Sequence, residues 1–345
     1  MRALVTGAGG FLGGAIARTL RDRGDDVRGF SRGEHLELAA YGIEQHQGDV
    51  ADLDAVTDAA RGVDIVFHTA AKVGAGGRSE DFCQTNVTGT ANVLTACREC
   101  GVRGLVYTST PSVVSGVADL EGVDESVGYT PHYQADYGRT KAEAERLVFS
   151  SASDDCKAVA LRPPLIWGPG DTSLLPRVIE RGRNGGLRRI KVPPKLQDIT
   201  YVDDAVQAHL LAGDLLMAGG DGARRINGRP YFVSSGEPVE VWDFMNRLLN
   251  AAGFAPIQKS VSLQTALVVG WVSEKVHSLS GAEGDPLMSR WIVRSLMSAR
   301  WFDISAARRD LGYEPRVSME DGMLRLKASL DDRDGQGRRG GQEHA

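Results

Sequence analysis

Two side chains four residues apart, Tyr137 and Lys141, form the pattern in this chain that is best suited to proton transfer. They read Y-x-x-x-K, and at helical spacing the phenol and the ammonium lie on one face of a helix. A phenol with a pKa of about 10 is a poor acid–base group at neutral pH, but a neighbouring cation stabilises its phenolate. Tyrosine–lysine pairs are common on protein surfaces, so the meaning of this one depends on the residues around it.

A run of hydroxyl side chains supplies that context. The segment Tyr107–Ser112 reads YTSTPS and follows an apolar stretch that is predicted to be a strand. One of its hydroxyls can hold a carbonyl oxygen of a substrate while Tyr137 donates the proton. The two features together indicate an enzyme that reduces a carbonyl group.

The first residues of the chain form a second pattern with chemical meaning. Ala3–Thr6 reads as a short buried strand and runs directly into GAGGFLG, after which a helical apolar period begins. In such a strand–turn–helix unit, Gly7 permits the turn, Gly10 lets the backbone approach a phosphate, and Gly13 lets helix and strand pack closely. The spacing G-x-x-G-x-x-G therefore predicts a cradle for the pyrophosphate of a dinucleotide. The contacts predicted from this turn are Gly7, Gly10, Phe11, Leu12 and Gly13.

The end of the second predicted strand decides between the two nicotinamide dinucleotides. A carboxylate there accepts hydrogen bonds from the ribose hydroxyls and repels a 2′-phosphate, whereas an arginine binds it. Here Ser31 stands at the acidic position and Arg32 follows, while Glu34 is too far along the chain. We therefore expect NADP(H) as the cofactor. The alternative is that Arg32 is a solvated loop residue.

Two further strand ends are expected to border the cofactor. Asp49 and Val50 follow the third predicted strand, where a carboxylate can meet the adenine amine. Thr69, Ala70 and Ala71 follow the fourth strand and place small residues beside the dinucleotide. Both segments are also compatible with ordinary strand-end chemistry.

Apolar strands alternate with helical stretches through the first half of the chain, which is the pattern of a doubly wound parallel sheet. We expect an α/β (Rossmann) fold in which residues 1–170 bind the nucleotide and carry the catalytic residues. Residues 171–329 are expected to form mainly a smaller C-terminal substrate lobe, interleaved with the last sheet elements, and the polar tail 330–345 is predicted to be disordered. The expected strands are Ala3–Thr6, Val27–Ser31, Ile43–Gln47, Ile65–His68, Leu105–Thr108 and Ala158–Leu161, and the expected helices include Gly89–Cys100 and Tyr137–Ser150.

Composition and charge exclude several other classes of protein. The net charge of −5 does not indicate a nucleic-acid-binding surface. Four scattered cysteines do not make a disulfide framework, and the C-x-x-C of Cys97 and Cys100 lacks the further ligands of a metal site, so we expect no metal. The N-terminus begins on a strand, which leaves no room for a signal peptide, and no run reaches the length of a membrane span. We therefore expect a cytoplasmic protein.

Several motifs, in order along the chain, resemble those of the extended short-chain dehydrogenase/reductase family. They are GAGGFLG, the Gly48–Asp49 pair, HTAA, NVTGT from Asn86, YTST, YGRTK, LRPPLIWGPGD and YVDD. The resemblance covers residue 1 to about residue 329 and implies an NAD(P)-dependent oxidoreductase. It also implies that Tyr137 is the proton donor or acceptor, and that Lys141 lowers its pKa and holds the nicotinamide ribose.

The same resemblance assigns further residues to the site. The catalytic hydroxyl of the family matches Thr110, where serine is more frequent. Threonine can make the same hydrogen bond, but its methyl group narrows the pocket, so Ser109 stays as the alternative. Asp203 matches a residue at the junction of the lobes, for which we expect a structural role. Cofactor contacts are implied for Asn86, Tyr137, Lys141, Pro163, Leu165 and Ile166.

The stretches VYTSTPSVV, LRPPLIWGPGD and ARWFDISAARRDLGYEP are most similar to the 3β-hydroxysteroid dehydrogenase-like branch of this family. Within that branch they resemble the NADPH-dependent reductases of bacterial long-chain olefin synthesis, which reduce the 3-oxo group of a 2-alkyl-3-oxoalkanoate. An apolar stretch, Leu263–Leu279, contains Trp271 and is followed by Trp291. Such a segment can form a lipid-chain tunnel or lie on a membrane surface, and a core helix of the smaller lobe is the alternative.

Other functions stay open on the sequence alone. A 3β-hydroxysteroid or sterol dehydrogenase would use the same residues in the same roles, whereas the apolar second lobe fits a nucleotide-sugar epimerase poorly. A non-catalytic nucleotide sensor would have no need of both Tyr137 and Lys141. The resemblance implies a homodimer formed through the helix that bears Tyr137, and enzymes of the same pathway as partners. Three arginines could receive a substrate carboxylate, although a solvated basic face is the favoured interpretation: Arg177, Arg181 and Arg183.

Overall fold

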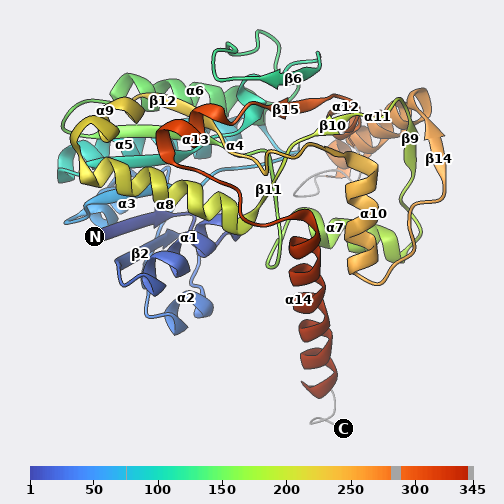
Figure 1. Ribbon diagram of the computed structural model, residues 1–345, viewed down its shortest axis with the longest axis horizontal. Coiled ribbons are helices and arrows are strands. Elements are labelled where there is room, and N and C mark those ends of the chain that lie inside the picture. The colour runs from blue at the N-terminus through green and yellow to red at the C-terminus, as the bar shows by residue number, and fades with distance from the viewer. Residues whose placement is uncertain (75, 281–288, 341–345) are drawn as a thin grey trace.

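The computed structural model describes residues 1–74, 76–280 and 289–340. A seven-stranded sheet in the order β12-β7-β5-β4-β1-β2-β3 forms its centre, and every neighbouring pair in it is parallel (Figure 1). The strand order reverses between β1 and β4, which confirms the predicted doubly wound sheet; in such sheets ligands bind beyond the carboxyl ends of the strands at this reversal. The strands are β1 (Arg2–Thr6), β2 (Asp26–Ser31), β3 (Glu44–Gln47), β4 (Ile65–His68), β5 (Gly104–Thr108), β7 (Lys157–Arg162) and β12 (Arg229–Phe232).

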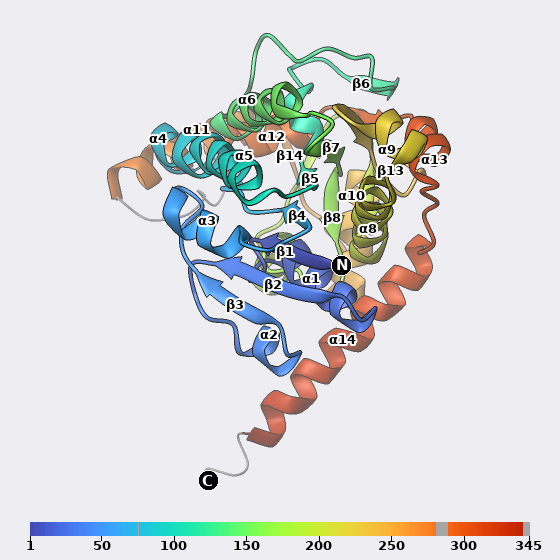
Figure 2. The same cartoon turned by 90° about the vertical axis from the view of Figure 1, so that its left-hand side faces the viewer.

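Helices cover both faces of this sheet, which explains why its inner strands are apolar on both sides (Figure 2). On β1, Ala3 and Val5 pack in one layer with helices α1 and α8, whereas Leu4 packs in the other with α3 and α5. Each predicted strand ends within one residue of its observed bounds, and both predicted helices form. The helices of these layers are α1 (Phe11–Asp22), α3 (Leu53–Ala60), α5 (Gly89–Cys100), α6 (Asp136–Ser151), α8 (Val202–Ala218), α9 (Gly220–Ile226) and α13 (Ser305–Leu311).

The second half of the chain builds a smaller lobe but also returns to the central sheet. It supplies the edge strand β12, and its strand β15 pairs with β6 from the first half in a sheet of order β13-β10-β15-β6. The two halves are therefore interleaved, while the boundary at residue 170 stays a prediction. The strands outside the central sheet are β6 (Leu120–Val123), β8 (Leu165–Trp167), β9 (Arg189–Lys191), β10 (Leu196–Gln197), β11 (Ile199–Tyr201), β13 (Val239–Glu240), β14 (Ser260–Ser262) and β15 (Arg300–Phe302). The remaining helices are α2 (Leu36–Ala40), α4 (Ser79–Phe82), the π-helix η1 (Cys83–Thr88), the 3₁₀-helix η2 (Pro111–Val113), α7 (Leu174–Arg183), α10 (Val241–Ala251), α11 (Leu263–Ser280), α12 (Arg290–Leu296) and α14 (Met319–Gly340).

Helix α14 points away from the body of the molecule (Figure 1). The tail that was expected to be disordered from residue 330 is instead helical as far as Gly340, and the rest of it lies outside the described residues. Helix formation is cooperative, so a helix that is already nucleated extends into polar residues that would not start one. Leu326 is buried and Met323 packs against the core, so the first turns of α14 supply that nucleus.

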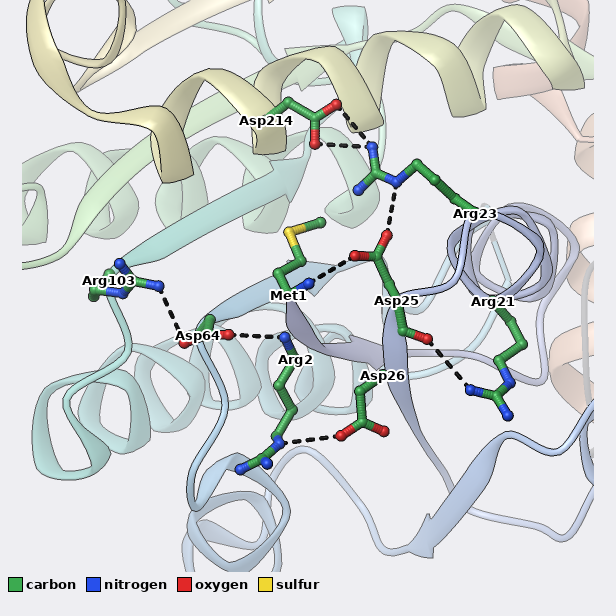
Figure 3. A network of polar contacts seen from close by, with 9 residues as sticks. All are labelled: Met1, Arg2, Arg21, Arg23, Asp25, Asp26, Asp64, Arg103 and Asp214. Carbon is green, nitrogen blue, oxygen red and sulfur yellow. Dashed lines mark hydrogen bonds and ion pairs between the residues drawn. The ribbon is translucent and has the colours of Figure 1, made fainter.

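Ion pairs between charged residues connect the sheet to neighbouring helices at the amino ends of its strands (Figure 3). The ammonium group of Met1 and the guanidinium of Arg23 both donate to Asp25, at 2.8 and 2.7 Å, and Arg23 also reaches Asp214 on α8. Burial acts to raise the pKa of Asp25, but these two donors outweigh it and hold the pKa below its ordinary value. The ion pairs therefore join β2, α1 and α8 at the edge opposite the glycine-rich turn.

Candidate active site

The glycine-rich turn joins β1 to α1 at the carboxyl edge of the sheet. Gly7 has a φ of +72°, in the left-handed region, and its carbonyl accepts the N–H of Gly10 at 2.9 Å. A Cβ at Gly13 would lie 2.2 Å from the Gly7 carbonyl oxygen, so only glycine permits this close packing. The first N–H groups of α1 have no partner within the helix. A tight backbone beside the free amides of a helix N-terminus fits the pyrophosphate of a dinucleotide.

The residues after β4 pack against this turn. Thr69 Oγ1 donates to the backbone carbonyl of Thr6 at 2.7 Å, and the N–H of Ala70 donates to Thr6 Oγ1 at 3.3 Å. A Cβ at Gly7 would lie 2.9 Å from Ala70, so the two segments are in direct contact. Thr69 and Ala70 therefore lie beside the glycine turn, as the prediction for a cofactor site requires.

Asn86 is buried in the π-helix η1, and its side chain is fully engaged with protein atoms. Its carbonyl oxygen accepts the N–H of Lys72 at 2.7 Å, and its amide donates to the Lys72 carbonyl and to Thr140 Oγ1, both at 3.0 Å. Asn86 thus connects the loop after β4 to helix α6. π-helical turns are frequent at functional sites, but a direct cofactor contact from Asn86 stays a prediction.

The ends of β2 and β3 lie side by side, on the side of β1 away from β4. Ser31 Oγ donates to the carbonyl of Gly33 at 2.9 Å, and Arg32 is exposed. Asp49 at the end of β3 is exposed and accepts the N–H of Ala51 at 2.9 Å, while Val50 is buried. The second strand therefore ends on a hydroxyl and a guanidinium, without a carboxylate at the acidic position.

Tyr137 and Thr110 come together from α6 and from the end of β5. The Thr110 hydroxyl lies near enough to the Tyr137 phenol to act on its pKa, and it also donates to Ser112 Oγ at 3.3 Å. Burial raises the pKa of Tyr137 to about 12, and the nearby Thr110 hydroxyl offsets part of the rise, so the phenol is protonated at neutral pH. Ser109, the alternative hydroxyl, is buried and donates instead to the carboxylate of Glu145. The geometry therefore favours Thr110 as the hydroxyl that faces the reacting group.

Lys141 lies one turn after Tyr137 and is almost completely buried. Its ammonium donates to the backbone carbonyl of Thr108 at 2.6 Å and lies 4.1 Å from the ring centroid of Tyr107. Burial lowers the pKa of Lys141 to about 7, and the negative charge of Glu145 opposes this shift. Burial and Thr110 are the causes that shift the pKa of Tyr137 in this structure. The prediction that Lys141 lowers the pKa of Tyr137 stays a prediction.

A buried ion pair next to these residues was not predicted from the sequence. Glu145 is 0% exposed and accepts from Arg162 at 3.1 Å (Nε) and 2.5 Å (Nη2), while the Arg162 side chain is 4% exposed. The same carboxylate accepts the hydroxyls of Ser109 and, at 2.9 Å, Tyr129. Glu145 follows Lys141 by four residues, a spacing that puts both side chains on one face of α6. This spacing is the feature of the sequence from which Glu145 could have been predicted to lie near the site.

The remaining predicted contacts lie where the two lobes meet. Pro163 is buried after β7, and Leu165 and Ile166 lie on β8, which pairs in parallel with β11. Asp203 is exposed and pairs with Arg325 on α14 at 3.0 Å. Its buried neighbour Asp204 accepts two backbone N–H groups of the segment before α14, so Asp204 shares the structural role that we expect of Asp203. The donors are Arg316 and Val317.

Helix α11 packs one face against the core of the smaller lobe through Ala266, Leu263 and Leu267 and exposes its other face, so its interpretation as a core helix holds for one face only. Val268 is 61% exposed and Trp271 48% exposed, whereas Ala266 on the other face is buried. Among the described residues, no helix is long and apolar enough to cross a bilayer. Of the three arginines considered as carboxylate ligands, Arg181 is partly buried, and Arg177 and Arg183 are exposed on α7.

Comparison with known proteins gives three matches that bear on this site. Residues 4–264 match the 3-beta hydroxysteroid dehydrogenase/isomerase family. The 2-alkyl-3-oxoalkanoate reductase of Stenotrophomonas maltophilia is 44% identical over 331 residues, which cover 95% of this chain and 99% of that protein. The 3 beta-hydroxysteroid dehydrogenase/Delta 5→4-isomerase of Mycobacterium tuberculosis is 33% identical over 333 residues, 93% of this chain and 88% of that protein.

The fold is also found in solved structures. UDP-glucuronic acid 4-epimerase from Bacillus cereus, in complex with NAD, has a TM-score of 0.73 at 21% identity and covers 96% of this chain and 99% of its own. At that identity the likeness concerns the fold alone. Together the matches confirm the family that the motifs predicted, and with it an NAD(P)-dependent oxidoreductase.

Proposed function

This chain belongs to the 3-beta hydroxysteroid dehydrogenase/isomerase family, and we propose that it uses NADPH to reduce the 3-oxo group of a long-chain 2-alkyl-3-oxoalkanoate to the 2-alkyl-3-hydroxyalkanoate. The observation that carries the proposal is the 44% identity to a 2-alkyl-3-oxoalkanoate reductase across 99% of its length. The proposal includes a place in bacterial olefin (hydrocarbon) synthesis.

The side chains at the carboxyl edge of the sheet provide the proton chemistry that this reaction needs. A bound dinucleotide would supply the hydride that adds to the carbonyl carbon. The Thr110 hydroxyl orients the substrate carbonyl, and the neighbouring Tyr137 phenol, protonated at neutral pH, donates its proton to the oxygen as negative charge develops there. The ammonium of Lys141, held on the Thr108 carbonyl, places positive charge one helical turn away and favours the phenolate that is left.

The preference for NADPH rests on the end of β2. Ser31 and Arg32 stand where a carboxylate would repel the 2′-phosphate, and Arg32 is free to turn toward it because it is exposed. The preference for a lipophilic substrate is supported by α11, whose valines and Trp271 present apolar surface on the smaller lobe. Such a surface suits a long alkyl chain or the face of a lipid bilayer, and we propose a peripheral membrane contact there.

A second candidate function is oxidation of a 3β-hydroxysteroid. It is favoured by the 33% identity to the mycobacterial hydroxysteroid dehydrogenase over 93% of this chain. The same three side chains, Thr110, Tyr137 and Lys141, would act in reverse, with Tyr137 accepting the proton of the alcohol.

A cofactor-linked assay separates the two functions. The purified chain is incubated with a 2-alkyl-3-oxoalkanoate and either NADPH or NADH, and in a parallel set with a 3β-hydroxysteroid and NAD⁺ or NADP⁺. Oxidation of NADPH with the β-keto acid, faster than with NADH, is the expected result. Turnover of the steroid with NAD⁺, and none of the β-keto acid, would replace the proposal by the second function.

A further inference from the structure

One glycine of the phosphate-binding turn is not explained by the dinucleotide motif. The spacing G-x-x-G-x-x-G requires Gly7, Gly10 and Gly13, whereas Gly9 falls between the required positions. The φ of Gly9 is not in the left-handed region, so its backbone conformation is open to other residues. A Cβ at Gly9 would, however, lie 1.8 Å from Nε2 of His35. Glycine at this position therefore leaves room for the imidazole ring of His35.

His35 is held in this place by the sheet. It follows β2 by four residues and immediately precedes α2. Its backbone N–H donates to Gln45 Oε1 at 2.8 Å, and Gln45 Nε2 donates to the His35 carbonyl at 3.1 Å. Gln45 lies on β3, which pairs with β2. These two hydrogen bonds fix the backbone of His35 in the loop after β2. Its imidazole ring therefore lies against the glycine turn, although His35 is not part of a helix or strand.

We propose that His35 completes a subsite for the 2′-phosphate of NADPH, together with Ser31 and Arg32. The proposal rests on the proposed use of NADPH. In a doubly wound sheet the adenosine ribose lies between the glycine turn and the end of β2, and these are the two segments that His35 connects. Nε2 of an imidazole can donate a charge-assisted hydrogen bond to a phosphate oxygen, beside the guanidinium of Arg32 and the hydroxyl of Ser31.

Binding constants of the free enzyme test the subsite without turnover. Isothermal titration calorimetry with NADPH and with NADH gives the affinity ratio for the wild-type chain and for His35→Ala. Loss of one hydrogen bond to a charged group weakens NADPH binding about 10-fold or more, while NADH, which lacks the phosphate, binds as before. Gly9→Ala pushes the ring away without removing it and should shift the ratio in the same direction. His46→Ala is the matched control, because His46 lies on β3 and pairs with Glu44 at 2.7 Å.

The outcomes separate this subsite from the proposed function. Selective loss of NADPH affinity in His35→Ala, with none in His46→Ala, supports it. If the wild-type chain prefers NADPH but His35→Ala weakens both dinucleotides equally or neither, the subsite is wrong and the use of NADPH stands. If the wild-type chain binds NADH more tightly, both are overturned.

Discussion

We expect Glu145→Ala to destabilise the protein strongly, because it would leave a buried charge without a partner. Glu145 is 0% exposed, and the guanidinium of Arg162, 4% exposed, makes two hydrogen bonds to it. Within the described residues Arg162 forms its ion pair with Glu145, acts on the carboxylate of Glu125 without pairing with it, and has no hydrogen-bond partner at Nη1. Truncation of Glu145 therefore removes the counter-charge of a cation that water cannot reach.

The magnitude follows from the burial of both partners. Removal of one member of a buried ion pair costs about 3–5 kcal/mol of the free energy of unfolding. With an unfolding entropy of about 2.1 cal/mol/K per residue, a chain of 345 residues loses about 4–7 °C of Tm for that cost. Replacement of both partners by apolar residues removes the unpaired charge, so Glu145→Met combined with Arg162→Leu should recover most of the loss.

Urea denaturation and calorimetry of the purified variants measure this effect. Glu143→Ala is the control, because Glu143 lies on the same helix but is 40% exposed and pairs with the partly exposed Arg139 at 2.8 Å. An exposed pair of this kind contributes at most about 1 kcal/mol. The reasoning would be refuted if Glu145→Ala cost no more than Glu143→Ala, or if the double apolar variant were less stable than the single one.

Three further predictions concern the proposed catalytic residues and the smaller lobe. Tyr137→Phe should lower kcat/KM for the ketone about 100-fold or more, while calorimetry should show that the variant still binds NADPH; full activity would exclude Tyr137 as the proton donor. Lys141→Met should abolish activity and raise Tm, and the rise in Tm should be larger at pH 6 than at pH 10. Burial lowers the pKa of Lys141 in the folded protein to about 7. The buried ammonium therefore destabilises the fold fully below pH 7, and this cost shrinks as the pH rises toward the ordinary lysine pKa. An equal change in Tm at both pH values would contradict this. The wild-type chain should sediment with vesicles that contain phosphatidylglycerol, and the combined Val268→Asn and Trp271→Ala variant should not; a wild-type chain that stays in the supernatant would exclude the membrane contact.

The central sheet could be predicted closely because its signals are local. Ile65–His68 and Leu105–Thr108 are apolar runs that end at glycine or polar residues, and burial on both faces makes them stand out from their surroundings. The smaller lobe offers no such signal. Its strands β9, β10 and β13 are two or three residues long, and β10 pairs with β15 through Gln197 and Arg300, which are far apart in sequence. Tertiary packing selects these strands, so no window of sequence predicts them.

The candidate site divides in the same way. Tyr137 and Lys141 can be predicted as a pair because one helix sets their spacing, and the glycine turn can be predicted because a strand and a helix flank it. The choice between Thr110 and Ser109 could not be made from sequence, since it depends on which hydroxyl the buried Glu145 takes. His35 was missed for a similar reason: its contact with Gly9 crosses from the loop after β2 to the loop after β1.

The contacts of α6 explain how the two side chains that we propose for proton transfer, Tyr137 and Lys141, are held in place. On the side of η1, Thr140 accepts the buried amide of Asn86 at 3.0 Å. One turn further along, Glu145 joins the helix to the ends of β5 and β7 through Ser109 and Arg162. These buried contacts enclose the turn that contains Lys141 and prevent the helix from rotating about its axis. Catalytic groups act most effectively when their orientation is fixed before the substrate binds, and the buried hydrogen bonds of α6 would fix the orientation of the proposed pair in this way.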